Sequence, residues 1–154
     1  MQKKIAIIGC GASGMMAAIR ASQLGADVTI YEHAKPGKKI LSTGNGKCNL
    51  TNNKMDLEYF FTHAPKRLQS CLSRFGKEET KVFFQELGLL LKVKNGYYYP
   101  WSEQAAIVQQ ILLNELQRKK ITLITEAVVK DIIPSKKNKG KNWSVVLENG
   151  QNAY

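Results

Sequence analysis

The chain has 154 residues, enough for one domain with a buried core, and its apolar fraction of 44% is ordinary for a globular protein. No apolar run approaches the roughly twenty residues of a membrane-spanning helix, and no cleavage signal follows the Lys-Lys start, so we expect a cytoplasmic protein without a membrane segment. The formal net charge of +11 would attract polyanions, but the basic residues are scattered. This pattern favours solvated surface charge over specific nucleic-acid binding, and the lysines of residues 136–141 are expected at a solvated hairpin tip.

The first expected element is a strand over Lys4 to Ile8 that ends in a glycine turn. Gly9 allows the turn off the strand, Gly11 lets backbone amides approach phosphates because it has no Cβ, and Gly14 lets the next helix pack tightly. Phosphates would then lie at the positive end of that helix. The spacing therefore predicts a dinucleotide pyrophosphate site.

A helix over Ala12 to Leu24, stopped by Gly25, is expected to lead into a second strand that ends at Glu32. The carboxylate of Glu32 is placed to accept hydrogen bonds from ribose hydroxyls, and it disfavours a 2′-phosphate. Three glycines alone are weak evidence. Here the strand, the helix and the acid agree, although they do not say which dinucleotide binds.

Residues 36–53 are too polar and glycine-rich for an ordinary helix or strand, which favours a binding loop. The residues expected to serve it offer left-handed backbone, cationic side chains and amide groups: Gly44, Asn45, Gly46, Lys38, Lys39, Lys47 and Asn49.

Beyond this loop, two helices over 65–75 and 77–87 are expected, then a hairpin with Asn95-Gly96 at its turn. Ser102 is expected to cap a helix that runs to about Lys119, with Glu103 in its first turn. A parallel strand at 121–124 and two antiparallel strands at 126–133 and 143–147 complete the order, and Asn149-Gly150 starts another turn. This order predicts an α/β fold, a parallel sheet with a helical and β insertion at about 54–100. The chain stops before any element could return beside the first strand, so we expect a truncated protein.

The three cysteines lack the spacing of a zinc site or a disulfide framework, so reduced thiols and no metal site are expected. Cys10 suits the tight turn because it is small, and Cys71 is expected on an apolar helix face. His33 is expected to face solvent, and His63 to cap a helix or lie exposed.

The run from Gly37 to Asn52 resembles the signature of a bacterial flavoprotein family often described as NAD(P)/FAD-dependent oxidoreductases, which includes aminoacetone-oxidase-like and bile-acid dehydro-reductase-like proteins. The segment Tyr99 to Ala105 resembles that family's aromatic-Pro-x-Ser segment. Val129 to Ile132 resembles the strand whose backbone meets adenine in many two-dinucleotide-domain flavoproteins. The resemblance covers essentially the whole chain and implies a Rossmann-like FAD-binding domain, with residues 1–154 as its N-terminal part and the substrate domain absent.

Carried over by position, the resemblance implies a set of FAD-binding residues. The pyrophosphate would be held by Gly9, Gly11, Ala12, Ser13 and Gly14, and the adenosine ribose by Glu32. The ribityl chain and flavin would lie along Lys39, Thr43, Gly44, Asn45, Gly46, Cys48 and Asn49, and adenine would meet the backbone of Val129.

This chain departs from the family at Lys39 and Lys47, where arginine is common, and at Asn45, where a third glycine is common. Lysine loses the bidentate fork of arginine, and asparagine adopts left-handed backbone less freely than glycine. Family members are also much longer, with a later strand that closes the FAD sheet. We therefore expect this polypeptide alone to bind FAD weakly or not at all, because the first strand keeps an unpaired edge.

In the complete protein the flavin would carry the redox chemistry, with NAD(P)H or oxygen as partner and an unknown substrate. Cys48 is the one candidate reactive side chain, against the simpler interpretation of a small packed residue. Two other classes stay open. An NAD-only dehydrogenase domain would share the first glycine motif but has no need of the second glycine loop, and a flavoprotein acting on transfer RNA or another nucleic acid would need a contiguous positive face.

Overall fold

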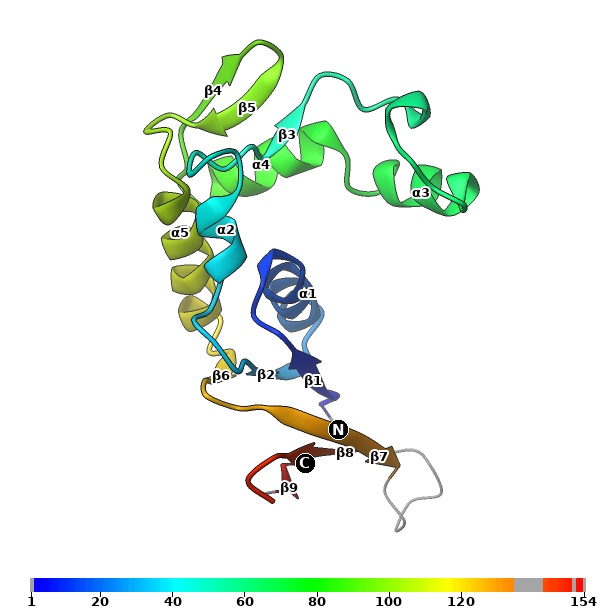
Figure 1. The fold of residues 1–154 in the computed structure, drawn as a ribbon, viewed down its shortest axis with the longest axis vertical. Coiled ribbons are helices and arrows are strands. Elements are labelled where there is room, and N and C mark those ends of the chain that lie inside the picture. Colours follow the sequence, from blue (N-terminus) through cyan, green and yellow to red (C-terminus); the bar gives the residue numbers. More distant parts are fainter. Residues whose placement is uncertain (1, 135–142, 151, 154) are drawn as a thin grey trace. The chain divides into compact units, whose positions relative to one another are not determined.

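The computed structural model describes residues 2–134, 143–150 and 152–153. It contains a three-stranded parallel sheet, and one helix connects the first two strands of this sheet. The strands β1 (Lys4–Ile8), β2 (Asp27–Tyr31) and β6 (Thr122–Ile124) lie in the order β1-β2-β6, all parallel. Helix α1 (Ala12–Gln23) connects β1 to β2 (Figure 1). These elements confirm the predicted βαβ unit and the parallel strand near residues 121–124.

Helix α1 is amphipathic, and its buried side chains are Met15, Ala18 and Ile19. Their spacing of three and four residues places them on one face of the helix. The helix ends at Gln23 with Leu24 as its C-cap, and Gly25 follows with φ of 83°, the left-handed conformation that commonly terminates a helix. The predicted stop at Gly25 is therefore confirmed.

An antiparallel sheet follows, made of β7 (Val129–Pro134), β8 (Trp143–Leu147) and β9 (Asn152–Ala153). Val145 and Leu147 from β8 are buried in one cluster with Tyr31 and Ala127, which ties this sheet to the end of β2. The predicted antiparallel strands are confirmed, and Asn149-Gly150 does form a turn. The predicted lysine-rich hairpin tip at 136–141 lies outside the described residues.

The chain divides into two compact units, Met1–Lys39 with Leu112–Tyr154 as the first and Ile40–Ile111 as the second. The predicted insertion at about 54–100 lies inside the second unit. Helix α2 (Lys38–Ser42) crosses the boundary into the second unit. The further elements of that unit are β3 (Thr51–Asn52), the 3-10 helix η1 (Leu57–Tyr59), α3 (Pro65–Leu72), α4 (Lys77–Glu86), β4 (Leu91–Lys94) and β5 (Tyr97–Pro100), followed by α5 (Ala105–Arg118), which continues past the second boundary.

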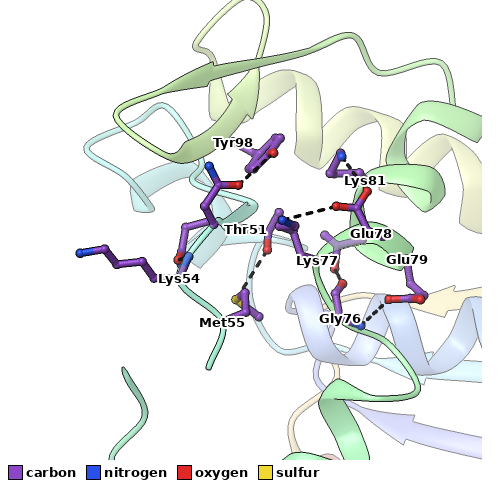
Figure 2. A network of polar contacts seen from close by, with 12 residues as sticks. Thr51, Lys54, Met55, Gly76, Lys77, Glu78, Glu79, Lys81 and Tyr98 are labelled. Carbon is purple, nitrogen blue, oxygen red and sulfur yellow. Dashed lines mark hydrogen bonds and ion pairs between the residues drawn. The ribbon is translucent and has the colours of Figure 1, made fainter. Parts of the chain in front are cut away.

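The predicted hairpin is present as β4 and β5, joined by Asn95 and Gly96. These two residues have φ of 53° and 81°, the positive values that a type I′ turn requires. Strand β3 pairs with the other edge of β5. Figure 2 shows how α4 lies beside this small sheet, with Lys81 over the ring of Tyr98 at 5.2 Å.

The beginning of α4 is held by its own side chains. Glu79 accepts a hydrogen bond from the Gly76 amide at 2.8 Å, and Glu78 pairs with Lys77 and Lys81 at 3.5 and 2.7 Å (Figure 2). Phe84 is the buried side chain of this helix.

Three predictions in the second unit are wrong in detail. Residues 36–53 contain a helical turn, α2, and a two-residue strand, β3, because Ile40 is buried and Thr51 pairs with Tyr98. Helix α3 ends at Leu72 rather than Phe75 and has no buried residue. Cys71 is therefore exposed and does not lie on an apolar packing face.

The start of α5 also differs from the prediction. Ser102 accepts a hydrogen bond from the Gln104 amide at 3.3 Å within a local turn, and the helix begins at Ala105. Ser102 is thus not the cap, and Glu103 is not in the first helical turn. Glu103 has a positive φ of 52°, which is outside the helical range, and its carboxylate faces two lysines instead of the helix amides.

Candidate functional site

The glycine turn after β1 has the geometry predicted for Gly9 and Gly14. Gly9 has φ of 94°, and its amide donates to the Tyr31 carbonyl at 2.8 Å, which holds the turn against the end of β2. A Cβ added at Gly14 would overlap the carbonyl oxygen of Gly9. Helix α1 therefore approaches the turn more closely than any residue with a side chain would allow.

The first turn of α1 presents unused hydrogen-bond donors. Gly11 caps the helix without a side-chain hydrogen bond, and the amides of Ala12, Ser13 and Gly14 have no acceptor within the described part of the chain. A Cβ added at Gly11 would meet nothing within 4 Å. A row of free amides at a helix N-terminus beside open space suits an anionic group such as a pyrophosphate.

Glu32, at the end of β2, is a buried carboxylate with two backbone donors. Its oxygens accept the Cys10 amide at 2.6 Å and the Ala34 amide at 2.8 Å, and the Nδ1 atom of His33 lies 3.2 Å away. Burial alone would raise the pKa of Glu32, but these two hydrogen bonds and His33 lower it below the usual range. The carboxylate is therefore ionised at neutral pH and still has lone pairs for a ribose hydroxyl.

Burial and the charge of Glu32 together determine the state of the neighbouring thiol. Cys10 is fully buried, and burial together with the negative charge of Glu32 raises the pKa of its thiol to about 11. A protonated buried thiol is a packing residue. This agrees with the predicted role of Cys10 as a small side chain in the turn.

Residues 43–49, which we call the second glycine loop, adopt the predicted left-handed backbone. Gly44, Asn45, Gly46 and Cys48 all have positive φ, between 55° and 80°. A Cβ at Gly44 would lie 2.8 Å from the Asn49 amide nitrogen. The loop therefore needs glycine at position 44 both for its conformation and for space.

Thr43 and Cys48 close the loop on itself. The Thr43 hydroxyl donates to the Ile40 carbonyl at 2.6 Å, and the Cys48 amide donates to the Thr43 carbonyl at 3.0 Å. Cys48 is buried, and burial raises the pKa of its thiol while a hydrogen bond with Thr43 opposes that rise. The thiol is thus protonated at neutral pH, which favours the packed interpretation of Cys48 over the reactive one.

Glu103 is a residue of this region that sequence reasoning missed. Its carboxylate lies 3.1 Å from Lys47 Nζ and 2.7 Å from Lys92 Nζ, and the Ala105 amide donates to the Gly46 carbonyl at 2.8 Å. Lys47, predicted as a cationic ligand for an anion, is therefore paired with a carboxylate. No sequence signal links these three positions, since they come from a loop, a strand and a turn.

The remaining predicted residues lie as follows. Val129 packs against the Tyr31 cluster and pairs with Leu147 in the β7–β8 ladder. Lys39 and Asn49 are exposed. His33 is also exposed, as expected, although it faces Glu32.

Neither a metal centre nor a membrane-spanning helix is found in the part of the chain that the structure describes. No three His, Cys, Asp or Glu side chains gather there to hold an ion. None of the helices described is both long and apolar enough to cross a membrane.

The predicted residues thus fall into two groups. The first unit contains Gly9, Gly11, Ala12, Ser13, Gly14, Glu32, Lys39 and Val129, and the second contains Thr43, Gly44, Asn45, Gly46, Cys48 and Asn49. The first group, on a parallel βαβ unit, defines a Rossmann-type dinucleotide-binding domain.

The comparison with known families gives the same class and a particular family. Residues 3–153 match the HI0933-like protein Rossmann domain, so the chain belongs to the HI0933-like family. Over 125 residues, 79% of this chain, it is 45% identical to the 3-dehydro-bile acid delta(4,6)-reductase of Clostridium scindens. These matches confirm the family resemblance.

Two further similarities are more distant. The chain is 29% identical over 73% of its length to the ribosomal RNA dihydrouridine synthase of Haemophilus influenzae. The 3-ketosteroid-delta4-(5alpha)-dehydrogenase of Rhodococcus jostii RHA1 superposes with a TM-score of 0.69 at 11% identity, covering 98% of this chain and 43% of that chain, which shows a common fold. The chain spans 31% and 28% of the two curated relatives.

Proposed function

We propose that this chain is the FAD-binding part of a flavin-dependent oxidoreductase. The observation that carries the proposal is the row of free amides on Ala12, Ser13 and Gly14 beside the buried carboxylate of Glu32. The amides suit a pyrophosphate and the carboxylate suits a ribose, so together they fit an adenine dinucleotide.

The second glycine loop distinguishes FAD from NAD in this proposal. Four of the five residues from Gly44 to Cys48 have left-handed backbone, and an NAD-only domain does not need a loop of this conformation. Backbone amides in such a loop can approach a ligand without side-chain obstruction. FAD, when bound, would supply two-electron redox chemistry.

The residues of the chain would then bind and orient rather than react. The amides at the N-terminus of α1 would hold the pyrophosphate, Glu32 would accept the ribose hydroxyls, and Val129 would meet adenine through its backbone. The thiol of Cys48 is buried and protonated, so we assign it a packing role in the loop.

The substrate class that we propose is an alkene conjugated with a carbonyl group in a bile-acid-like ring system, reduced with NAD(P)H as electron donor. Its support is the 45% identity to a protein named as a bile acid delta(4,6)-reductase. The name denotes reduction of ring double bonds in a 3-oxo bile acid.

A second candidate is the reduction of uridine in ribosomal RNA, which is the chemistry named for the relatives with 29% identity. The net charge of +11 would strengthen RNA binding, although the basic residues are scattered along the sequence. The lower identity makes it the weaker of the two.

The test uses the protein expressed from the complete reading frame. We expect it to copurify with FAD, which is released on denaturation and identified by chromatography, and to oxidise NAD(P)H when a 3-oxo-4,6-diene bile acid is added. Oxidation with uridine-containing ribosomal RNA instead would select the second candidate. A bound nicotinamide dinucleotide and no flavin would refute the proposal.

Cytoplasmic localisation is part of the same proposal. Cys10, Cys48 and Cys71 are all free thiols, the usual state in a reducing compartment. Fractionation of the cells that make the protein would test it.

A further inference from the structure

The turn that carries Glu103, a residue outside the predicted binding residues, contacts the second glycine loop at two points. Glu103 Oε2 lies 3.1 Å from Lys47 Nζ, and Lys47 belongs to the loop. Two residues further along the chain, the Ala105 amide donates to the carbonyl of Gly46 at 2.8 Å. The turn that contains Glu103 therefore contacts the loop through one ion pair and one backbone hydrogen bond.

The same carboxylate also reaches the hairpin. Its other oxygen, Oε1, lies 2.7 Å from the Nζ atom of Lys92 in β4. Glu103 is 23% exposed, less than either lysine, so its charge lies between them rather than in open solvent. It is thus shared by a loop residue and a strand residue.

The backbone at Glu103 is shaped for this contact. Its φ is 52°, a left-handed value that a residue with a long side chain rarely adopts. Its amide donates to the Pro100 carbonyl at 2.9 Å, which closes a turn directly after β5. The turn delivers the carboxylate to the two lysines, and α5 begins only afterwards, at Ala105.

We propose that Glu103 is a positioning residue that holds the second glycine loop in its ligand-ready conformation before the flavin binds. The proposal rests on the proposed function, since it assumes that the loop contacts FAD. It assigns Glu103 no contact with the flavin itself.

The physical reason lies in the charges and in the loop's composition. Without the carboxylate, two ammonium groups that share it would repel each other, and Lys47 would no longer tie the loop to the turn. Gly44 and Gly46 allow the loop many other conformations, so it needs an external contact to remain in one. Isolated exposed ion pairs stabilise little, so the effect expected is on the loop rather than on global stability.

The first experiment needs no ligand. In the 154-residue chain, Glu103→Gln should increase amide hydrogen exchange at least tenfold at Ala105 and at Cys48, whose amides close on the loop. The matched control is Glu78→Gln, because Glu78 also binds two lysines in the same unit but is placed on α4. Exchange at Ala105 and Cys48 should be unchanged in the control, and equal exchange in both variants would overturn the proposal.

The second experiment measures FAD affinity in the protein from the complete reading frame. Glu103→Gln should raise the Kd for FAD about tenfold and shift the absorbance spectrum of the bound flavin, whereas Glu78→Gln should change neither. Lys92→Met should raise the Kd by a smaller factor, and the double variant should bind no more weakly than Glu103→Gln alone, because both changes break one contact.

The outcomes separate the two proposals. Absence of FAD from the wild-type protein would refute the proposed function. Normal FAD binding by the wild type and an unchanged Kd and spectrum in Glu103→Gln would refute the positioning role alone, even if the loop exchanged faster. Reduced thermal stability with unchanged FAD affinity would mean that Glu103 is only structural.

Discussion

The close approach of α1 to the glycine turn makes Gly14→Ala a sharp test of the structure. An added Cβ would overlap the carbonyl oxygen of Gly9, which is backbone and cannot rotate away. Overpacking of this kind costs about 1–3 kcal/mol, and because the obstacle is rigid backbone we expect a cost of about 3 kcal/mol. Replacing a helical glycine by alanine returns about 1 kcal/mol of helix propensity. The net expected loss of stability is therefore about 2 kcal/mol.

Gly11→Ala is the matched control, since it adds the same methyl group three residues earlier. Nothing lies within 4 Å of a Cβ at Gly11, and its φ of −80° and ψ of −176° suit alanine. The reduced entropy of the unfolded chain, about 0.4–1 kcal/mol, is offset by the poorer capping of alanine. We expect a change within about 0.5 kcal/mol.

Urea unfolding followed by far-ultraviolet circular dichroism measures both changes. With an m-value of about 2 kcal/mol/M, Gly14→Ala should lower the midpoint by about 1 M at unchanged m, and Gly11→Ala should leave it nearly unaltered. FAD binding distinguishes the two variants in another way. The methyl group of Gly11→Ala would occupy the space proposed for the phosphates, so this variant should bind FAD more weakly in the complete protein although its stability is unchanged. A Gly14→Ala chain as stable as the wild type would refute the close approach.

Three further predictions follow from the site. Because the pKa of Glu32 is lowered in the folded protein, its ionised form stabilises the fold fully above the ordinary pKa of 4.5, and this stability is lost as the pH falls through the lower folded pKa. In Glu32→Gln, the free energy of unfolding should depend less on pH over that range, and parallel curves for the variant and the wild type would contradict the prediction. A thiol reagent at mildly alkaline pH should modify Cys71 quickly and Cys10 and Cys48 only after unfolding, as counted by mass spectrometry, and three equally fast thiols would contradict the burial. Titration of the 154-residue chain with FAD should show weak or no binding, because β1 pairs only with β2 among the described strands, and tight stoichiometric binding would show that this edge does not matter.

The parts of the fold that sequence predicted well depend on local backbone chemistry. The glycine turn at Gly9, the helix stop at Gly25 and the Asn95-Gly96 hairpin all need positive φ, and few residue types supply it. The family of the chain could be assigned from sequence for the same reason, since its second glycine loop needs unusual residues in fixed order.

The wrong predictions concern segments whose local composition indicates one structure but whose contacts with residues elsewhere in the chain produce another. Residues 36–53 have a polar loop's composition, yet burial of Ile40 and pairing of Thr51 with Tyr98 produce a helical turn and a short strand there. Ser102 has the right side chain for a helix cap, but the positive φ of Glu103 delays the helix to Ala105.

By itself, the sequence determined the βαβ order, the left-handed positions and the presence of an acid after β2, because each follows from the residue type and its near neighbours. Only the tertiary structure decided what the charged and sulfur groups do. The pKa of Glu32 is lowered because the Cys10 and Ala34 amides donate to its carboxylate, and Glu103 meets Lys47 and Lys92 because a loop, a turn and a strand come together. Such contacts join residues far apart in the chain, and their energies depend on distance and burial that no local pattern contains.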